Sequence, residues 1–429
     1  MFRHVAVIGA GAAGLVVGHE LLREGHTVVV YEKGEQVGGS WIYTSETESD
    51  PLGVDPNRYP VHSSLYKSLR VNLPRELMGF QAYPFVARNY EGSVDLRRYP
   101  GHEEVLRYLQ NFAREFGVDQ VVRLHTEVLN ARLVESNKWK VKSRKKDDVV
   151  EEETFDAVVV CNGHFSVPRL AQVPGSFYLP LVVILIGHYA SGLDIKRDLA
   201  GFAKEVHIAS RSVADETHEK QPGYDNMWLH SMVERASEDG TVVFRNGRVV
   251  SADVIMHCTG YKYNYPFLET NGIVTVDDNR VGPLYKHVFP PVLAPGLSFV
   301  GIPQKVIPFP FFELQSKWIA SVLSGRIVLP SQDEMMEDVK AFYSKLEASG
   351  KPKRYTHIMD YPQLIEYTDW LAAQCNCQGY EEWRKQMAYS AFKNAFITRP
   401  GTYRDEWDDE HLVAEANKDF IKYTSNKSK

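Results

Sequence analysis

A glycine-rich turn near the start of the chain constrains the fold more than any other feature. Residues Val5–Ile8 form an apolar run typical of a buried strand, Ala12–Glu24 has the pattern of a helix, and Thr27–Glu32 is a second strand. The turn between the first strand and the helix has the pattern G-x-G-x-x-G and consists of Gly9, Ala10, Gly11, Ala12, Ala13 and Gly14. This order predicts an α/β fold that begins with a Rossmann-like βαβ unit.

The three glycines of this turn suit a bound pyrophosphate. Gly9 permits the tight turn, Gly11 lets the backbone approach the phosphates, and Gly14 lets helix and strand pack closely. Free N–H groups at the helix N-terminus then face the anion. Glu32 lies 23 residues after Gly9, and its carboxylate can accept hydrogen bonds from a ribose 2′-OH but repels a 2′-phosphate. The site is therefore predicted to bind FAD or NAD rather than NADP; a glycine-rich turn without a ligand is the alternative.

A second pair of glycines follows in the segment Val37–Trp41. Adjacent glycines let a chain pass close to a cofactor, so Gly39 and Trp41 are predicted to contact it. An ordinary loop is an equally good interpretation of this segment.

A second strand–turn–helix–strand order begins at Val182. Its turn is a degenerate copy of the first and consists of Gly187, His188, Tyr189, Ala190, Ser191 and Gly192. Tyr189 stands where the central glycine would be, which restricts the approach of a phosphate. Arg211 lies 24 residues after Gly187, at the position that Glu32 has in the first unit. A guanidinium there binds a 2′-phosphate and indicates NADPH, whereas a solvated arginine after a strand is the alternative.

Two nucleotides in one chain imply a redox relay, in which NADPH delivers hydride to a flavin and the reduced flavin acts on a further partner. A redox disulfide as that partner requires two cysteines near the flavin. Cys161 and Cys258 each end an apolar strand and are interpreted as core thiols, and Cys375 and Cys377 form a lone C-x-C in the helical tail, too little for a metal site. Reaction with oxygen is therefore favoured, and no metal is predicted.

The composition narrows the functional class further. The chain has 429 residues and a net charge of −6, which suits two or three domains and gives no reason to expect a nucleic acid partner. Its longest apolar run, Leu179–Gly187, is far shorter than the ~18–20 residues that cross a bilayer. No targeting peptide is visible, and the few, unevenly spaced cysteines favour a reducing compartment. We therefore predict a cytoplasmic protein without a membrane or nucleic acid partner.

Two sets of runs in the sequence carry a family resemblance. The first set is Val5–Gly14, Val37–Trp41, Leu69–Glu76 and His257–Tyr261, and the second set is Gly187–Gly192, Lys204–Ser212, Phe267–Gly272, Pro283–Phe289 and Tyr403–Asp409. The first set resembles the flavin-containing monooxygenases as a whole, and the second resembles their S-oxygenating branch of plants. The resemblance covers nearly the whole chain.

The resemblance implies a mechanism and a substrate class. In that family NADPH reduces FAD, oxygen adds to the flavin as a C4a-hydroperoxide, and a thioether sulfur attacks the distal oxygen. Bound NADP⁺ shields the intermediate from water. Members of the plant branch convert methylthioalkyl glucosinolates to methylsulfinylalkyl glucosinolates. Asn72 matches the family's asparagine near the flavin and the nicotinamide, so the resemblance implies a catalytic role for it; an asparagine in a turn is the alternative.

One departure from the family pattern bears on function. The motif F-x-G-x-x-x-H-x-x-x-F/Y, which identifies the family, is missing: after Pro168–Gly175 the chain runs through Ser176–Pro180 directly into the next strand. We expect FAD to bind and NADP⁺ to be held less well, so that peroxide forms. The alternatives to an S-oxygenase are therefore an uncoupled NADPH oxidase or an inactive FAD-binding protein, and a related N-oxygenating or Baeyer–Villiger enzyme.

The predicted architecture has two Rossmann-like dinucleotide-binding domains of the three-layer ββα/αβα type. A discontinuous FAD-binding domain is expected over residues 1–175 and 290–429, with an NADPH-binding domain inserted over residues 176–289.

Overall fold

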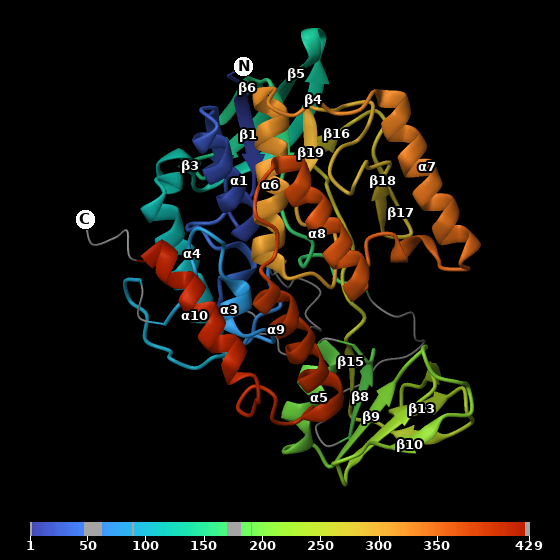
Figure 1. The fold of residues 1–429 in the computed structure, drawn as a ribbon. Helices are drawn as coiled ribbons and strands as arrows, with labels where there is room; N and C mark the ends of the chain where they lie inside the picture. The colour runs from blue at the N-terminus through green and yellow to red at the C-terminus, as the bar shows by residue number, and fades with distance from the viewer. Residues whose placement is uncertain (1, 47–61, 88–89, 170–181, 190, 425–429) are drawn as a thin grey trace. The chain divides into compact units, whose positions relative to one another are not determined.

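The structure is a computed structural model that describes residues 2–46, 62–87, 90–169, 182–189 and 191–424 (Figure 1). The chain divides into two compact units. The first comprises Met1–Ser166 and Tyr263–Lys429, and the second comprises Val167–Lys262. Each unit is built around its own sheet, in which most strands are parallel.

The central sheet of the first unit is parallel and has the strand order β19-β7-β1-β2-β3. Its strands are β1 (His4–Ile8), β2 (Thr27–Tyr31), β3 (Val122–Arg123), β7 (Ala157–Val160) and β19 (Leu297–Phe299). Successive side chains of a strand point to opposite faces. Val5 and Val7 accordingly join one hydrophobic core, while Ala6 and Ile8 join another. Burial on both faces explains why this strand is apolar throughout.

Helices cover one face of this sheet. Helix α1 (Ala12–Arg23) packs against α4 (His102–Glu115) and against the strongly buried α6 (Pro308–Ser324). The remaining helices of the unit are α3 (Arg75–Met78), α7 (Gln332–Ala348), α8 (Tyr361–Cys375), α9 (Glu382–Lys393) and α10 (Glu410–Thr424). Short helical turns are η1 (Gly39–Trp41), η2 (Val118–Val121), η3 (Glu135–Asn137), η4 (Lys353–Tyr355) and η5 (Asn394–Thr398).

A second sheet covers the opposite face and completes three layers of the ββα type. Its strand order is β16-β4-β5-β6, and Trp139 of β5 is fully buried in the core between the two sheets. Its strands are β4 (Thr126–Val134), β5 (Lys138–Lys145), β6 (Val150–Phe155) and β16 (Leu268–Glu269), and a separate hairpin is formed by β17 (Thr275–Asp277) and β18 (Arg280–Gly282).

The second unit repeats this layering. Its sheet has the order β10-β11-β9-β8-β15, and Val183 and Leu185 of β8 face one core while Ile184 and Ile186 face another. Helix α5 (Ser191–Ala200) contributes to the first of these cores, and an antiparallel sheet of β12, β13 and β14 contributes to the second. The strands are β8 (Val182–Ile186), β9 (Glu205–Ala209), β10 (His218–Lys220), β11 (Met227–His230), β12 (Val233–Ala236), β13 (Thr241–Phe244), β14 (Val249–Ser251) and β15 (Val254–His257). The prediction of an α/β protein with two Rossmann-like units is confirmed.

The limits of the second unit differ from the predicted boundaries at 175/176 and 289/290. Residues 263–289 cluster with the first unit. The reason is non-local pairing: β16 adds to the edge of β4 in parallel register, and the Tyr263 hydroxyl donates to the carbonyl oxygen of Ile302 at 2.5 Å. Residues 170–181, around the point where the family motif is missing, lie outside the described part of the chain.

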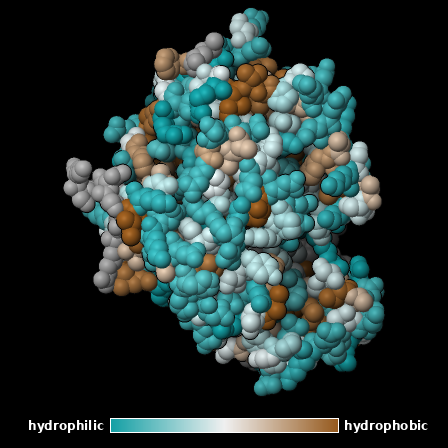
Figure 2. All heavy atoms as spheres, in the orientation of Figure 1, coloured by the Kyte–Doolittle hydropathy of each residue, from teal (hydrophilic) through white to brown (hydrophobic). Residues whose placement is uncertain are grey.

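Within the described residues, no helix combines the length and the apolar character needed to cross a membrane. The face drawn in Figure 2 is mainly hydrophilic, and its hydrophobic patches are small and separate.

Three histidines lie together in the second unit. The His207 Nδ1 and His230 Nε2 atoms are 2.9 Å apart, and the His218 and His230 ring centroids are 4.8 Å apart. His230 is fully buried and stacks on Phe244 at 4.1 Å. Burial lowers the pKa of His230 to about 3, with His207 and His218 adding to the effect, and burial also lowers the pKa values of those two histidines.

This cluster predicts acid sensitivity of the second unit. A histidine whose folded pKa is depressed binds fewer protons folded than unfolded, so its contribution to stability is complete above about pH 6.5 and is lost as the pH falls towards the folded value. Replacing His230 with phenylalanine should reduce the loss of unfolding free energy between about pH 7 and about pH 5 by about 1–2 kcal/mol. Urea unfolding followed by tryptophan fluorescence measures this, and Trp228, which stacks on His207, contributes the signal of the second unit. An equal loss of unfolding free energy between these two pH values in the wild type and in His230→Phe would contradict the prediction.

Candidate functional site

The first glycine turn is fixed by its two neighbouring strands. The Gly9 N–H donates to the Tyr31 carbonyl (2.8 Å), and the Cys161 N–H donates to the Ile8 carbonyl (2.9 Å). A Cβ atom on Gly9 would lie 2.6 Å from the Cys161 carbonyl oxygen, and one on Gly14 would lie 1.8 Å from the Gly9 carbonyl oxygen. Both positions therefore require glycine for packing, whether or not a ligand is bound.

Gly11 is the exception among the three glycines. A Cβ atom there would come no closer than 3.4 Å to another described residue, at Gly39 Cα, and its φ of −77° is open to any residue. Gly11 is the N-cap of α1, whose first residues are Ala12 and Ala13 and whose first turn contains no acidic side chain. The space over Gly11 and the free N–H groups behind it therefore suit an anion such as a pyrophosphate.

The segment with two adjacent glycines lies directly on this turn. The Gly38 N–H donates to the Ala10 carbonyl at 3.0 Å, and a Cβ atom on Gly39 would lie 2.7 Å from Gly11 Cα. Trp41 ends η1 and is half-buried. Gly39 thus contacts the turn itself, and the predicted contacts of Gly39 and Trp41 with a cofactor stay predictions.

Glu32 follows β2 and stands at the rim of the first turn. One carboxylate oxygen accepts from the Ala10 N–H (2.9 Å) and the other from the Gly34 N–H (2.7 Å). A carboxylate oxygen can accept more than one hydrogen bond, so capacity remains for a hydroxyl group. The two backbone bonds fix the negative charge beside the turn, where a 2′-phosphate would be repelled.

The second glycine turn repeats the backbone contacts of the first. The Gly187 N–H donates to the Ala209 carbonyl (2.9 Å), and the Cys258 N–H donates to the Ile186 carbonyl (2.8 Å). A Cβ atom on Gly187 would lie 2.4 Å from the Cys258 carbonyl oxygen, and one on Gly192 would lie 2.2 Å from the Gly187 carbonyl oxygen. The two turns are therefore built in the same way.

Cys161 and Cys258 occupy equivalent positions in the two turns, which sequence reasoning missed. Each follows the strand that pairs in parallel with the strand before the turn, and its carbonyl oxygen lies against the first glycine of the motif. Burial raises the pKa of the Cys161 thiol far above its usual range and that of Cys258 to about 11, so neither is a reactive thiolate. The signal was present as a repeated C-x-G, in Cys161–Gly163 and Cys258–Gly260.

The side chains of the second turn differ from those of the first. Tyr189 is 46% exposed, and the half-buried His188 has an Nε2 atom without a hydrogen-bond partner in the described part of the chain. Ala190 lies outside the described residues, and Ser191 begins α5. Arg211, beyond the end of β9, is exposed, and its guanidinium has no hydrogen bond or ion pair to a described residue. Its donors are thus available to a phosphate.

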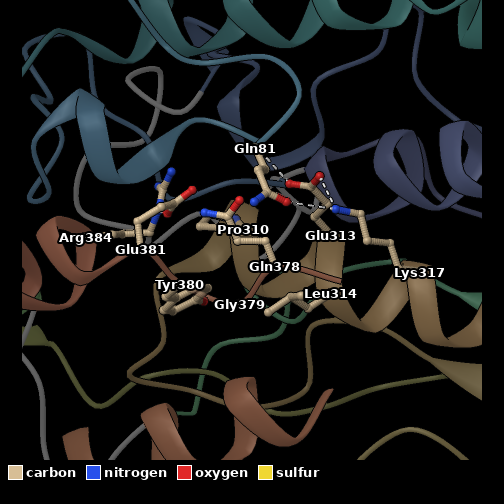
Figure 3. A pocket seen from close by; sticks show the side chains of 10 residues that line it. All are labelled: Gln81, Pro310, Glu313, Leu314, Lys317, Gln378, Gly379, Tyr380, Glu381 and Arg384. Atoms are coloured by element: carbon tan, nitrogen blue, oxygen red, sulfur yellow. Dashed lines mark hydrogen bonds and ion pairs between the residues drawn. The ribbon is translucent and has the colours of Figure 1, made fainter. Parts of the chain in front are cut away.

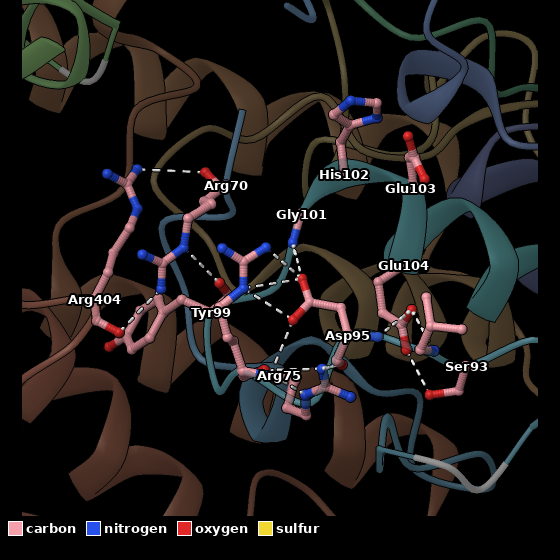
Figure 4. Close-up of polar contacts among 12 residues, drawn as sticks. Arg70, Arg75, Ser93, Asp95, Tyr99, Gly101, His102, Glu103, Glu104 and Arg404 are labelled. Carbon is pink, nitrogen blue, oxygen red and sulfur yellow. Dashed lines mark hydrogen bonds and ion pairs between the residues drawn. The ribbon is translucent and has the colours of Figure 1, made fainter. Parts of the chain in front are cut away.

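Asn72 lies in the loop before α3, apart from any regular element. It is exposed, and its side chain has no hydrogen bond to a described residue. Residues near the C-terminus hold this loop in place through a set of hydrogen bonds, the brace. Arg70 donates to both carboxylate oxygens of Asp405 (2.8 and 3.0 Å), and Arg404 donates to the Val71 carbonyl (2.9 Å). In Figure 4 the Arg70 and Arg404 side chains lie side by side.

A buried ion pair reinforces this brace. Arg98 donates to Asp409 at 3.0 Å (Nη2 to Oδ2), and both side chains are almost completely buried. Arg75 donates to the carbonyls of Asp95 and Arg97 (2.6 and 2.8 Å). The contact between the 70–76 and 403–409 segments could not be read from the sequence, because nothing local specifies which acidic residue a given arginine meets.

Loss of the buried carboxylate should destabilise the first unit. Replacing Asp409 with alanine leaves the buried Arg98 guanidinium without its main partner, which is expected to cost about 3 kcal/mol of unfolding free energy. The matched control, Asp405→Ala, removes a carboxylate that is 66% exposed and should cost less than about 1 kcal/mol. Chemical denaturation of both variants measures the difference; equal losses would contradict it.

Comparison with known proteins identifies the family. The profile of the family described as flavin-binding monooxygenase-like matches residues 2–178 and 222–379. The chain belongs to this family. The intervening residues 179–221, which contain the second glycine turn and Arg211, are not matched.

Individual relatives of this monooxygenase extend the match over nearly its whole length. It is 58% identical to "Flavin-containing monooxygenase FMO GS-OX-like 2" of Arabidopsis thaliana, covering 99% of this chain and 96% of the relative. It is 54% identical to "Flavin-containing monooxygenase FMO GS-OX5" of the same plant, covering 98% and 95%. The solved S-allyl-L-cysteine S-oxygenase from Allium sativum is 58% identical, with a TM-score of 0.92 and coverage of 98% and 99%. The resemblance inferred from the sequence is confirmed.

The family uses FAD and NADPH, and the residues present fit both. The open space over Gly11 suits the FAD pyrophosphate. At the second turn, the Arg211 guanidinium and the His188 Nε2 atom, neither of which has a hydrogen-bond partner among the described residues, suit the phosphates of NADPH.

Proposed function

We propose that this monooxygenase oxidises thioethers to sulfoxides, and that its substrates are methylthioalkyl glucosinolates, which become methylsulfinylalkyl glucosinolates. The support is the identity of 54–58% to the GS-OX and GS-OX-like relatives. S-allyl-L-cysteine, which the Allium sativum relative oxygenates at sulfur, is also a thioether. Bound FAD, reduced by NADPH, supplies the activated oxygen. A thioether sulfur is itself nucleophilic, so no acid–base triad is needed.

We propose a role for each site residue from its position in the structure. The first glycine turn and Glu32 hold FAD on the first unit, and the second turn and Arg211 hold NADPH on the second. Asn72 is proposed to position the reacting groups: its exposed amide has no hydrogen bond to a described residue, and Arg404 and the Arg70–Asp405 pair hold its loop in place.

One observation favours a second candidate, an uncoupled NADPH oxidase. The alignment with the GS-OX-like 2 relative spans 446 positions, 17 more than the 429 residues of this chain, so at least 17 positions of the relative have no counterpart here. This agrees with the loss of the family motif after Gly175. Without that segment, weaker retention of NADP⁺ would let water reach the flavin, and peroxide would form.

A single assay separates the two candidates. The purified flavoprotein is given NADPH and a methylthioalkyl glucosinolate, and NADPH loss, peroxide and sulfoxide are followed together. Sulfoxide equal to the NADPH consumed supports the S-oxygenase, whereas peroxide equal to NADPH supports the oxidase. Oxygenation of an amine or a ketone, with the thioether untouched, would overturn the thioether assignment.

The role of Asn72 has its own test. Asn72→Ala should lower the ratio of sulfoxide to NADPH consumed, because the reacting groups lose a positioning hydrogen bond. Ser68→Ala is the control, because Ser68 is exposed and lies near the start of the same loop. This variant should leave the ratio of sulfoxide to NADPH unchanged. Equal ratios in Asn72→Ala and the wild type would remove Asn72 from the site.

A further inference from the structure

A hollow in the first unit is formed by the chain that enters β16 and by the start of β17. Its volume is about 250 Å³, and it is lined by residues 263–265, Leu268 and residues 274–276. All of these residues belong to the first unit. The volume is slightly below the ~300–1,000 Å³ of sites for drug-sized ligands, so the hollow suits a group of about one ring.

The walls of this hollow are held in place by contacts within the unit. Tyr263 is buried, and its hydroxyl donates to a carbonyl beyond β19. The Tyr265 ring packs edge-on against Phe299, with ring centroids 5.3 Å apart. The Thr270 hydroxyl accepts from the Val274 N–H (3.1 Å) and donates to the Val274 carbonyl (3.2 Å), which closes the turn between β16 and β17. The hollow is therefore formed before a ligand arrives.

The chemistry of the walls selects the class of ligand. None of the lining residues is charged, so a carboxylate, ammonium or sulfate would find no ionic partner there. The Asn264 amide and the hydroxyls of Tyr265 and Thr275 have no hydrogen bond to a described residue, while Leu268 and two valines add apolar surface. A sugar ring combines apolar C–H faces, which pack on aromatic rings, with hydroxyls that bond to amides and hydroxyls. The walls thus fit a neutral sugar.

A hollow lined from α6 and α9 shows the opposite case (Figure 3). Its volume is about 10 Å³, which is room for about one water molecule. Its charged side chains are paired with each other: Lys317 lies 2.8 Å from Glu313, and Arg384 lies 2.6 Å from Glu381. It has neither the room nor the unpaired charge for a ligand.

The hollow beside β16 is linked to the first glycine turn through one residue. Asn162, which follows β7, donates from Nδ2 to the Asn264 carbonyl (3.1 Å), and a Cβ atom on Gly9 would lie 3.1 Å from Asn162 Cα. In the sheet, β7 lies on the side of β1 away from β2 and Glu32. With Glu32 at the adenosine ribose, as proposed above, the rest of FAD extends towards β7 and therefore towards the hollow.

We propose that this hollow binds the glucose ring of a methylthioalkyl glucosinolate. The proposal rests on the proposed function, since that substrate class supplies the sugar. An alkyl chain separates the glucose from the methylthio sulfur, so a sugar site beside the reaction site, and not within it, is what the substrate requires. The sulfate of the substrate stays outside the uncharged walls. The hollow thereby favours glucosylated thioethers over simple dialkyl sulfides.

The first test measures binding without turnover. The intact flavoprotein is mixed with methyl β-D-glucopyranoside, and saturation-transfer NMR detects ring protons that contact the protein. We expect transfer to the sugar ring, and about threefold to tenfold weaker binding in Thr275→Val, which loses one hydrogen bond at an exposed position. Thr154→Val, at an exposed threonine of β6 that does not line the hollow, is the matched control. Absence of transfer in the unmodified protein, or equal affinity in the two variants, would overturn the proposal.

The second test separates this proposal from the proposed function. The KM for a methylthioalkyl glucosinolate is compared with that for a dialkyl sulfide of the same chain length without the sugar. Thr275→Val should raise the ratio of the two constants by about threefold to tenfold relative to Thr154→Val. Sulfoxide formation with the same ratio in both variants would remove the sugar site and leave the S-oxygenase. Glucoside binding by NMR without oxidation of any thioether would remove the S-oxygenase and leave the sugar site.

Discussion

Gly11→Ala yields a folded protein that binds FAD at least about 100-fold more weakly, a loss of about 2.7 kcal/mol. The new methyl group clears the protein, with its nearest neighbour at 3.4 Å, but it occupies the space over the turn and keeps a pyrophosphate away from the N–H groups of α1. Flavin content after purification and titration of the apoprotein with FAD measure the change, and circular dichroism confirms the fold.

Two further glycine variants are controls for this result. Gly14→Ala places a Cβ atom 1.8 Å from the Gly9 carbonyl oxygen and should prevent stable folding, whereas Gly401→Ala meets no atom within 4 Å and should have no effect. A Gly11→Ala protein that is as yellow as the wild type would show that no nucleotide lies on the first turn.

Arg211→Ala should raise the KM for NADPH by about 10- to 100-fold and leave the KM for NADH unchanged. Charge-assisted hydrogen bonds from a guanidinium to a phosphate contribute about 1.5–3 kcal/mol. NADH lacks the 2′-phosphate and does not form these bonds, so its binding does not change. Steady-state oxidation of the two cofactors by the flavoprotein measures the ratio of the two constants.

Arg235 supplies the matched control. Arg235 is an exposed residue of β12, in the antiparallel sheet of the same unit. Arg235→Ala removes one positive charge from the unit, as Arg211→Ala does, but at a residue outside the second turn. A similar rise in the KM for NADPH in both variants would indicate a general loss of positive charge, and an unchanged KM in Arg211→Ala would place the 2′-phosphate elsewhere.

Local features were predictable from the sequence, because they depend on neighbouring residues alone. The strand before Gly9, the helix after it and the second strand all follow from apolar periodicity and from glycine, and the structure has them within a few residues of the predicted limits. The position of Glu32 at the rim of the turn followed from the length of one βαβ unit.

Contacts between distant segments were not predictable in this way. The boundary at 289/290 was misplaced because β16 adds to the edge of β4, more than a hundred residues earlier, and a two-residue strand carries no periodic signal. The carbonyls of Cys161 and Cys258 explain the first glycine of each motif, but the repeated C-x-G does not indicate which distant glycine each carbonyl contacts. The brace of the Asn72 loop joins residues more than three hundred positions apart.

The brace also sets an order of events during synthesis. The loop around Asn72 leaves the ribosome early, but Arg404, Asp405 and Asp409 follow only after more than three hundred further residues. A nascent chain can close its first glycine turn and still lack the anchors of this loop. We therefore expect the Asn72 loop to reach its final conformation only near the end of synthesis, long after the residues of the first glycine turn have been made.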